Sequence, residues 1–293
     1  MPTTAANDVT LCYDTFGSAD DPTLLLVNGL GSQMINYEPA FCELLVAQGL
    51  HVVRFDNRDV GLSSKTEGPV PDVAALVAAA GAREPVTDVP YTLADMAVDA
   101  FAVLDAVGVE RAHIAGMSMG GMIVQRMAID RPARVRSMTS IMSTTGDRSV
   151  GRATSEAAAV LVSEPPVDRD GYIEYTVETR RVTAGAHNDD DYWRHHAGVM
   201  YDRSFHPAGS AFQIAALLAD GDRTAALGEL TMPVLVIHGR LDPLIQLSGG
   251  EATAAAVPGA ELLVLDDMGH DLPEQIWAEV VAGIVGVAAR AAG

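Results

Sequence analysis

Short apolar runs recur along the chain, and most have the length of a β-strand. Residues 9–17 alternate apolar and polar positions, which predicts an early antiparallel strand. Residues 23–28 and 51–56 form short apolar runs that predict two buried strands. A helix-length stretch at 39–48 separates them, so this part of the pattern predicts one βαβ unit.

Residues 92–109 instead place apolar side chains at helical spacing. Thr92 fits the N-cap position, and Asp95 follows three residues later, where a carboxylate can bond back to the capping residue. Gly108 supplies a stop signal. We therefore expect a capped helix in this segment.

Three further elements follow in the order strand, helix, strand. Residues 111–117 and 135–142 have strand patterns, and residues 119–130 have a helical pattern that ends before Pro132. Because parallel strands need crossover connections, this alternation predicts an α/β fold with a parallel sheet covered on both faces.

Strand patterns then stop from about residue 143 to residue 230, where acidic helical segments and turns dominate. They resume at 233–239 and 260–267. We therefore expect a core domain made of 1–142 and 231–293, with the helical insertion 143–230 forming a cap over the ends of the strands.

The charge balance narrows the classes of partner. The chain has 19 basic and 39 acidic residues, a net charge of −20. Such a charge repels nucleic acid and anionic membrane surfaces. No run reaches the roughly 18 apolar residues that a membrane span needs. We therefore expect neither nucleic acid nor a membrane span, while the oligomeric state stays open.

The cysteines and the first residues bear on the compartment. Cys12 and Cys42 have no metal-ligand spacing and do not amount to a disulfide framework, which favours a reducing compartment. Residues 1–17 lack the basic and apolar regions of a secretion signal. The expected location is the cytoplasm.

Candidate chemistry begins at Ser118, which lies in the G-x-S-x-G stretch GMSMG between a predicted strand and a predicted helix. A sharp turn there lifts the hydroxyl clear of the sheet, and Gly116 and Gly120 allow close packing around it. The amide of Met119 at the start of the helix is a candidate oxyanion donor. The alternative is a glycine-rich turn that holds a buried serine.

A serine hydroxyl needs a nearby base. Among eight histidines, His270 lies in a loop directly after the last predicted strand, at the same edge of the sheet as Ser118. His51 and His113 fall at or on strands and are expected to pack, and His238 precedes the loop that carries the acid. The remaining histidines, which lie in the insertion, are His187, His195, His196 and His206.

The base in turn needs a carboxylate to orient it. Asp242 follows the penultimate predicted strand and gives the chain order Ser118, Asp242, His270. Asp266 and Asp267 are rivals, but their closeness to His270 in sequence favours roles at a strand end or in a loop.

A second oxyanion donor is expected in the loop after the third strand. That loop has the sequence VNGLGSQM, in which Gly29 and Gly31 let the backbone turn inward. The amide of Leu30 is the candidate donor.

These motifs together resemble the α/β-hydrolase superfamily, and within it capped serine esterases of the aclacinomycin methylesterase type. The resemblance covers nearly the whole chain and rests on NGLGS, FDNRDVGLSS, GMSMGG, HGRLDP and MGHDLP in family order. It implies a mostly parallel sheet with an inserted helical cap and no cofactor. Asn28 stands where the family usually has a histidine.

Two other clusters have simpler explanations. In FDNRDVGLSS the resemblance suggests a structural role, with Asp56 and Arg58 in ion pairs rather than in contact with substrate. In HNDDDYWRHH the adjacent His195 and His196 cannot both face one metal on a helix, so no metal site is expected, and residues 189–191 look like a charged first turn.

The expected function is hydrolysis of a small to medium apolar carboxylic ester through an acyl-enzyme. A thioesterase or a cofactor-free perhydrolase could use the same three residues, and the fold can also serve as a small-molecule receptor without turnover. The insertion offers possible pocket-lining side chains, many of which could instead anchor it to the sheet. They are Leu161, Tyr172, Tyr175, Trp193, Met200, Phe205 and Phe212.

Overall fold

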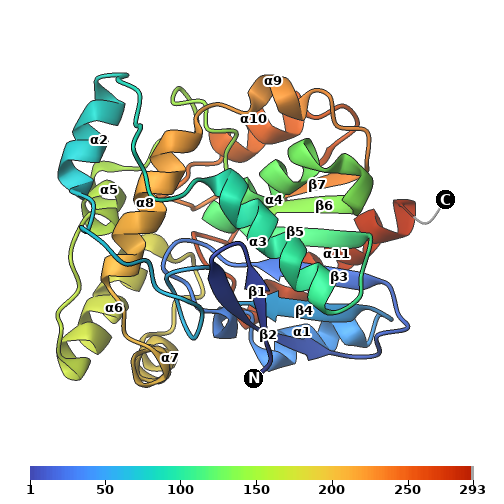
Figure 1. Ribbon diagram of the computed structural model, residues 1–293, viewed down its shortest axis with the longest axis horizontal. Helices are drawn as coiled ribbons and strands as arrows, with labels where there is room; N and C mark the ends of the chain where they lie inside the picture. Colours follow the sequence, from blue (N-terminus) through green and yellow to red (C-terminus); the bar gives the residue numbers. More distant parts are fainter. Residues whose placement is uncertain (292–293) are drawn as a thin grey trace.

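One sheet of eight strands forms the centre of the molecule (Figure 1). The computed structural model describes residues 1–291 and orders the strands β1-β2-β4-β3-β5-β6-β7-β8. β2 is antiparallel to β1 and to β4, and all later pairs are parallel. The strands are β1 (Thr3–Ala6), β2 (Val9–Phe16), β3 (Thr23–Val27), β4 (His51–Phe55), β5 (Ala112–Met117), β6 (Val135–Ile141), β7 (Val234–Gly239) and β8 (Glu261–Leu265). Only β1 escaped the sequence prediction.

Alternate residues of the inner strands face opposite sides of the sheet, and each side buries its own apolar cluster. Leu25 and Ile114 join the cluster under α3 and α4, whereas Leu24 and Ala115 join the cluster under α1 and α11. This two-sided covering confirms the predicted α/β fold with a mostly parallel sheet covered on both faces. The core helices are α1 (Pro39–Val46), α3 (Leu93–Ala106), α4 (Met119–Asp130), α10 (Ser248–Ala256) and α11 (Trp277–Arg290), with short 3-10 turns at Met34–Asn36, Pro132–Arg134 and Glu274–Ile276.

The predicted cap of α3 is present. The Asp95 N–H donates to the Thr92 hydroxyl at 3.2 Å, and the Thr92 N–H donates to the Asp95 carboxylate at 2.8 Å. Gly108 adopts a φ of +75°, so it turns the chain out of the helix as the stop signal predicted.

Five helices lie between β6 and β7, in the segment that lacks strand patterns. They are α5 (Ser155–Leu161), α6 (Arg169–Thr183), α7 (Asp190–Arg203), α8 (Ala208–Asp220) and α9 (Thr224–Leu227). In Figure 1, α5, α6 and α7 gather to one side of the sheet together with α2 (Val73–Gly81). The division at residues 143 and 230 stays a prediction.

The insertion is anchored to the sheet by part of its apolar surface. Phe212 of α8 is only 2% exposed and belongs to the core cluster, and Leu161 of α5 is 41% exposed. Within residues 1–291, no helix has the length and apolar character that crossing a bilayer requires.

Candidate active site

Ser118 occupies the sharp turn between β5 and α4. Its backbone has φ +56° and ψ −123°, a conformation that a residue with a side chain adopts only under strain. The turn leaves the Ser118 side chain partly exposed, whereas Met119 directly after it is fully buried. The strand-to-helix turn predicted at this serine is therefore present.

Glycines make this turn possible because neighbouring backbone approaches them closely. A Cβ atom on Gly120 would lie 2.2 Å from the Val27 carbonyl oxygen, and one on Gly116 would lie 2.1 Å from the Gly120 carbonyl oxygen. Real Cβ atoms do not approach backbone so closely, so any side chain at either position would push the turn off the sheet. The close packing predicted for these glycines is confirmed.

His270 connects the serine to a carboxylate. Its Nε2 lies 2.9 Å from Ser118 Oγ, and its Nδ1 lies 2.7 Å from Asp242 Oδ2. The three residues are far apart in the chain, yet they converge because each follows the carboxyl end of a parallel strand. The side chains form one continuous hydrogen-bonded series from carboxylate to hydroxyl.

The Asp242 carboxylate is held from behind by backbone. Its Oδ1 accepts hydrogen bonds from the N–H groups of Leu244 at 2.8 Å and Ile245 at 2.9 Å. Asp242 is only 4% exposed, so its remaining oxygen is directed to His270 in a shielded environment. Such an arrangement fixes the carboxylate as an acceptor for the imidazole Nδ1–H.

His238 packs behind this carboxylate. Its Nε2 donates to the Ile245 carbonyl at 2.7 Å and lies 3.7 Å from Asp242 Oδ2. Burial lowers the pKa of His238, which keeps the ring neutral. Sequence reasoning had placed this histidine only as the residue before the loop.

The loop that carries His270 is bound to the end of α6. The His270 N–H donates to the Thr183 carbonyl at 2.7 Å. Asp271 Oδ1 accepts hydrogen bonds from the N–H groups of Gly185 and Gly269, each at 3.1 Å. The sequence analysis missed this contact, because glycines and main-chain acceptors in separate segments give no sequence signal for each other.

The loop after β3 lies against the nucleophile. A Cβ atom on Gly29 would be 3.1 Å from Ser118 Cβ. The Gly31 N–H donates to Gln213 Oε1 at 2.8 Å, and Gln213 Nε2 donates to the Arg58 carbonyl at 2.8 Å. Gln213 belongs to α8 and is completely buried, so a helix of the insertion holds this loop. The sequence analysis did not single out Gln213.

Asn28 opens the same loop and is also completely buried. Its carbonyl accepts a hydrogen bond from Asn57 at 3.0 Å. Within residues 1–291, its side-chain amide has no hydrogen-bond partner. The replacement of the family's usual histidine therefore leaves a polar group without local bonds.

The FDNRDVGLSS segment forms ion pairs with distant elements. Asp56 binds Arg203 of α7 at 2.6 Å, and Arg58 binds Asp99 of α3 through two bonds of 2.6 and 2.8 Å. The expectation of ion pairs is confirmed. The partners lie elsewhere in the chain, which links this segment to both the insertion and the core.

The rival residues lie apart from the three converging side chains. His51 and His113 are buried and bond to Thr23 and Ser137, as expected of packed strand residues. Asp266 is exposed in an ion pair with Arg240. Asp267 is also exposed and lies 3.7 Å from His187.

The HNDDDYWRHH cluster forms the start of α7. The Asp189 carboxylate accepts hydrogen bonds from the N–H groups of Asp191 and Tyr192, which confirms a charged first turn. His195 is exposed, whereas His196 is buried and bonds to Asn36 at 2.8 Å. The two adjacent imidazoles therefore face different surroundings.

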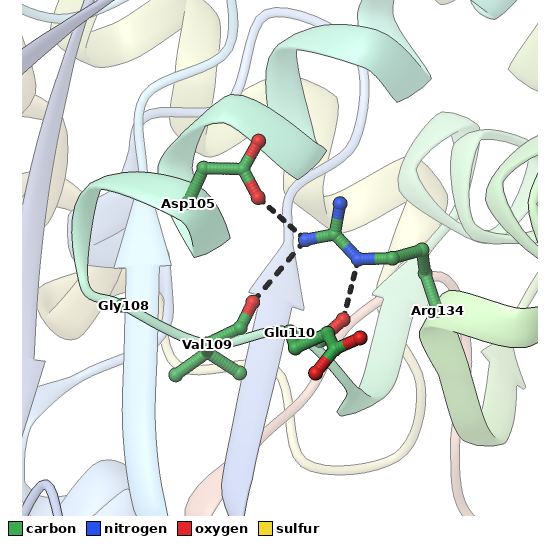
Figure 2. Close-up of a pocket in the computed structure, with 5 residues that line it drawn as sticks. All are labelled: Asp105, Gly108, Val109, Glu110 and Arg134. Atoms are coloured by element: carbon green, nitrogen blue, oxygen red, sulfur yellow. Dashed lines mark hydrogen bonds and ion pairs between the residues drawn. The ribbon is translucent and has the colours of Figure 1, made fainter.

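A shallow surface hollow lies at the opposite edge of the sheet. Its lining residues are Asp105, Gly108, Val109, Glu110 and Arg134 (Figure 2). Arg134 donates to the Asp105 carboxylate and to two main-chain carbonyls. Residues 105–110, which line most of the hollow, end before β5 begins, whereas Ser118 directly follows the end of β5. The hollow and Ser118 therefore lie at opposite ends of this strand, and the hollow has no part in the arrangement around Ser118.

Comparisons with known proteins agree with this architecture. A family model described as alpha/beta hydrolase fold matches residues 22–275. The chain is 28% identical to rhodomycin D methylesterase DauP of Streptomyces sp. (strain C5), with 97% of each chain covered. It is also 28% identical to 3-oxoadipate enol-lactonase 2 of Acinetobacter baylyi, covering 90% of this chain and 88% of that one. A solved hydrolase structure from Pseudomonas aeruginosa has a TM-score of 0.71 and 25% identity, covering 100% of this chain and 98% of that chain. The chain therefore belongs to the alpha/beta hydrolase fold family.

Proposed function

We propose that this chain is a carboxylic ester hydrolase that uses Ser118, His270 and Asp242 as a catalytic triad. The observation that carries the proposal is the position of His270, 2.9 Å from the hydroxyl and 2.7 Å from the carboxylate. Relatives named as a methylesterase and an enol-lactonase support an ester as the substrate class.

In the proposed reaction, Ser118 Oγ attacks the ester carbonyl while His270 Nε2 accepts the hydroxyl proton. Asp242 stabilises the imidazolium that forms. His270 then gives the proton to the departing alcohol, which leaves an acyl-enzyme on Ser118. A water molecule, deprotonated by His270, releases the acid and restores the serine.

The tetrahedral oxyanion needs hydrogen-bond donors, which we assign to the amides of Met119 and Leu30. As the first residue of α4, Met119 has no intrahelical acceptor for its N–H. Within the described part of the chain, the Leu30 N–H donates to no acceptor. Both amides are thus free for a substrate oxygen, and the Gln213 bond to Gly31 supports the second one.

The proposed substrate is a small to medium ester with an apolar body. Tyr172, Tyr192 and Trp193 on α6 and α7 are partly buried aromatic side chains close to the His270 loop. Met119 and Met122, which flank the serine, pack into the core cluster instead. The insertion rather than the turn at Ser118 would therefore select the acyl or alcohol group.

The test is Ser118→Ala, measured on chromogenic esters and by fluorophosphonate labelling. Loss of the nucleophile should lower kcat by about 10⁵-fold or more and abolish labelling, without changing the unfolding transition. Ser155→Ala removes an exposed serine of α5 and serves as the matched control. Labelling that persists in Ser118→Ala would show that another residue is the nucleophile.

A further inference from the structure

Arg180 lies in the last turn of α6, next to the proposed catalytic base. Its guanidinium carbon is 4.0 Å from the centre of the Trp193 ring, and Nη1 is 3.5 Å from the His270 carbonyl oxygen. The His270 main chain is itself bonded to Thr183, at the end of the same helix. The fold therefore places the Arg180 guanidinium at the edge of the proposed active site.

Arg180 is partly buried. Burial lowers the pKa of Arg180, and the nearby Asp271, Tyr192 and Tyr172 only partly oppose that effect. The residue nevertheless keeps part of its surface accessible, as Ser118 does. Arg180 can therefore still be reached from outside the protein, at a position beside the His270 loop.

No carboxylate in the described part of the chain forms an ion pair with this cation. Among residues 1–291, no carboxylate oxygen lies within the 4.0 Å ion-pair distance of Arg180. Asp271 is the nearby acid, but its Oδ1 is committed to the N–H groups of Gly185 and Gly269. Enclosing a charged group without a partner is costly, so an unpaired guanidinium in this position needs an explanation.

Other arginines in the molecule have guanidinium groups that are paired with carboxylates or carbonyls. Buried Arg58 makes two bonds to Asp99, and Arg134 in Figure 2 uses its donors on one carboxylate and two carbonyls. Arg181, the neighbour of Arg180, is exposed and paired with Asp190. Arg180 differs from them in its single long bond and its stacked ring.

We propose that Arg180 binds a carboxylate carried by the substrate, so that the enzyme prefers esters with one anionic group. This inference rests on the proposed ester hydrolysis. A guanidinium can donate two parallel hydrogen bonds to a carboxylate. Arg180 would give up its single long bond to the His270 carbonyl for this pair of bonds, and the change is favourable for a partly buried cation. The aromatic side chains around it would receive the apolar body of the same molecule.

The test compares two pairs of esters of matched shape, one with the charge on the acyl side and one on the alcohol side. The first pair is 4-nitrophenyl glutarate and 4-nitrophenyl 5-methylhexanoate. The second is 3-acetoxybenzoate and 3-isopropylphenyl acetate. For at least one pair, Arg180→Leu should lower kcat/KM for the anionic member roughly 10- to 100-fold and leave the neutral member within about threefold.

Arg181→Leu is the matched control, because it removes an exposed, paired arginine from the same turn. It should leave both ratios unchanged. Arg180→Lys should recover part of the preference for the anion, since it restores the charge without the fork. Equal loss for the charged and neutral members of both pairs would overturn the proposal and assign Arg180 a structural role.

A binding measurement separates this proposal from the proposed chemistry and does not depend on turnover. Calorimetry of Ser118→Ala with glutarate and with 3-hydroxybenzoate should detect binding of at least one anion, and adding Arg180→Leu should abolish it. Binding without hydrolysis of any ester would overturn the esterase and keep the anion site. Hydrolysis of esters without selective binding of an anion would support the esterase and overturn the anion site. If Arg180→Leu does not fold, inhibition of the unmodified enzyme by glutarate but not by glutaramide supports the site, and equal inhibition overturns it.

Discussion

The edge of the sheet that carries Ser118 and the helices that face it are built on different principles. At the sheet edge, the three converging side chains are held by hydrogen bonds to one another and to backbone, as in the Asp242 carboxylate with its two backbone donors. On α6 and α7, ion pairs such as Arg194 with Glu174 occupy the exposed side, while aromatic rings and the unpaired Arg180 lie toward the His270 loop. In the proposed enzyme, the reaction geometry would thus depend on backbone constraints, and substrate selection would depend on side chains of the insertion.

The two regions meet through few but specific bonds. Thr183 of α6 accepts a hydrogen bond from the His270 main chain, and Gln213 of α8 bonds to the loop after β3. Both contacts therefore tie the insertion to parts of the proposed site. Substitutions can therefore separate what each region contributes.

After loss of the nucleophile itself, the largest effect is expected from Asp242→Asn at the sheet edge. The asparagine oxygen would keep the bonds to Leu244 and Ile245, which turns its NH₂ group toward His270 and forces the imidazole into the wrong tautomer. We expect kcat/KM for a chromogenic ester to fall by about 10⁴-fold. Asp266→Asn, at an exposed rival acid, should leave the rate unchanged; a comparable loss there would question the assignment of the acid.

Gly120→Ala tests how tightly the sheet edge is packed. Its Cβ would overlap the Val27 carbonyl oxygen and lie 2.7 Å from the Asn28 carbonyl oxygen, and these main-chain atoms cannot rotate away as a side chain can. We expect the free energy of unfolding in urea to fall by about 3 kcal/mol or more.

Gly286→Ala in α11 is the control for this glycine, since its Cβ would meet no atom within 4 Å. Alanine favours a helix over glycine by up to about 1 kcal/mol, so the control should be neutral or more stable. A Gly120→Ala variant as stable as Gly286→Ala would show that the turn at Ser118 can accommodate a Cβ atom, and would contradict the close packing inferred there.

One buried histidine in each region should make the free energy of unfolding depend on pH. Burial lowers the pKa of His113 in β5 and of His196 in α7 to about 4. The unfolded chain takes up these protons near pH 6.5, so the stability present above that pH is lost as pH falls toward 4. As the pH falls from 7.5 to 5.0, each histidine should lower the free energy of unfolding by about 2 kcal/mol.

His113→Asn and His196→Asn should each remove that share of the pH dependence in urea titrations. The two substitutions should reduce the pH dependence of the unfolding free energy equally if the sheet and the insertion unfold together. A reduction for His113 alone would show that α7 separates from the sheet before global unfolding.

The smallest effect is expected where the two regions meet, from Gln213→Met. Methionine keeps the volume but leaves the Gly31 N–H and the Arg58 carbonyl without partners. We expect kcat to fall roughly tenfold with little change in KM, because the displaced loop carries the proposed Leu30 donor. A shift in KM alone would instead place Gln213 in substrate binding.

The sequence by itself determined most of the sheet, the helices α1, α3 and α4 that cover it, and the candidate triad. Apolar periodicity marks seven of the eight strands, and parallel strands must bring residues at their carboxyl ends to one edge, so Ser118, Asp242 and His270 could be grouped before any coordinates. β1 was missed because its four residues, Thr3–Ala6, are small and weakly apolar.

Only the tertiary structure decided how the insertion meets that edge. Gln213 and Arg180 gave no sequence signal, since a helical residue looks the same whether its side chain faces solvent, a loop or an enclosed space. Their roles follow from partners more than 80 residues away in the chain, such as the Gly31 N–H and the His270 carbonyl. Local pattern encodes the regular elements, whereas contacts between distant segments depend on how those elements pack.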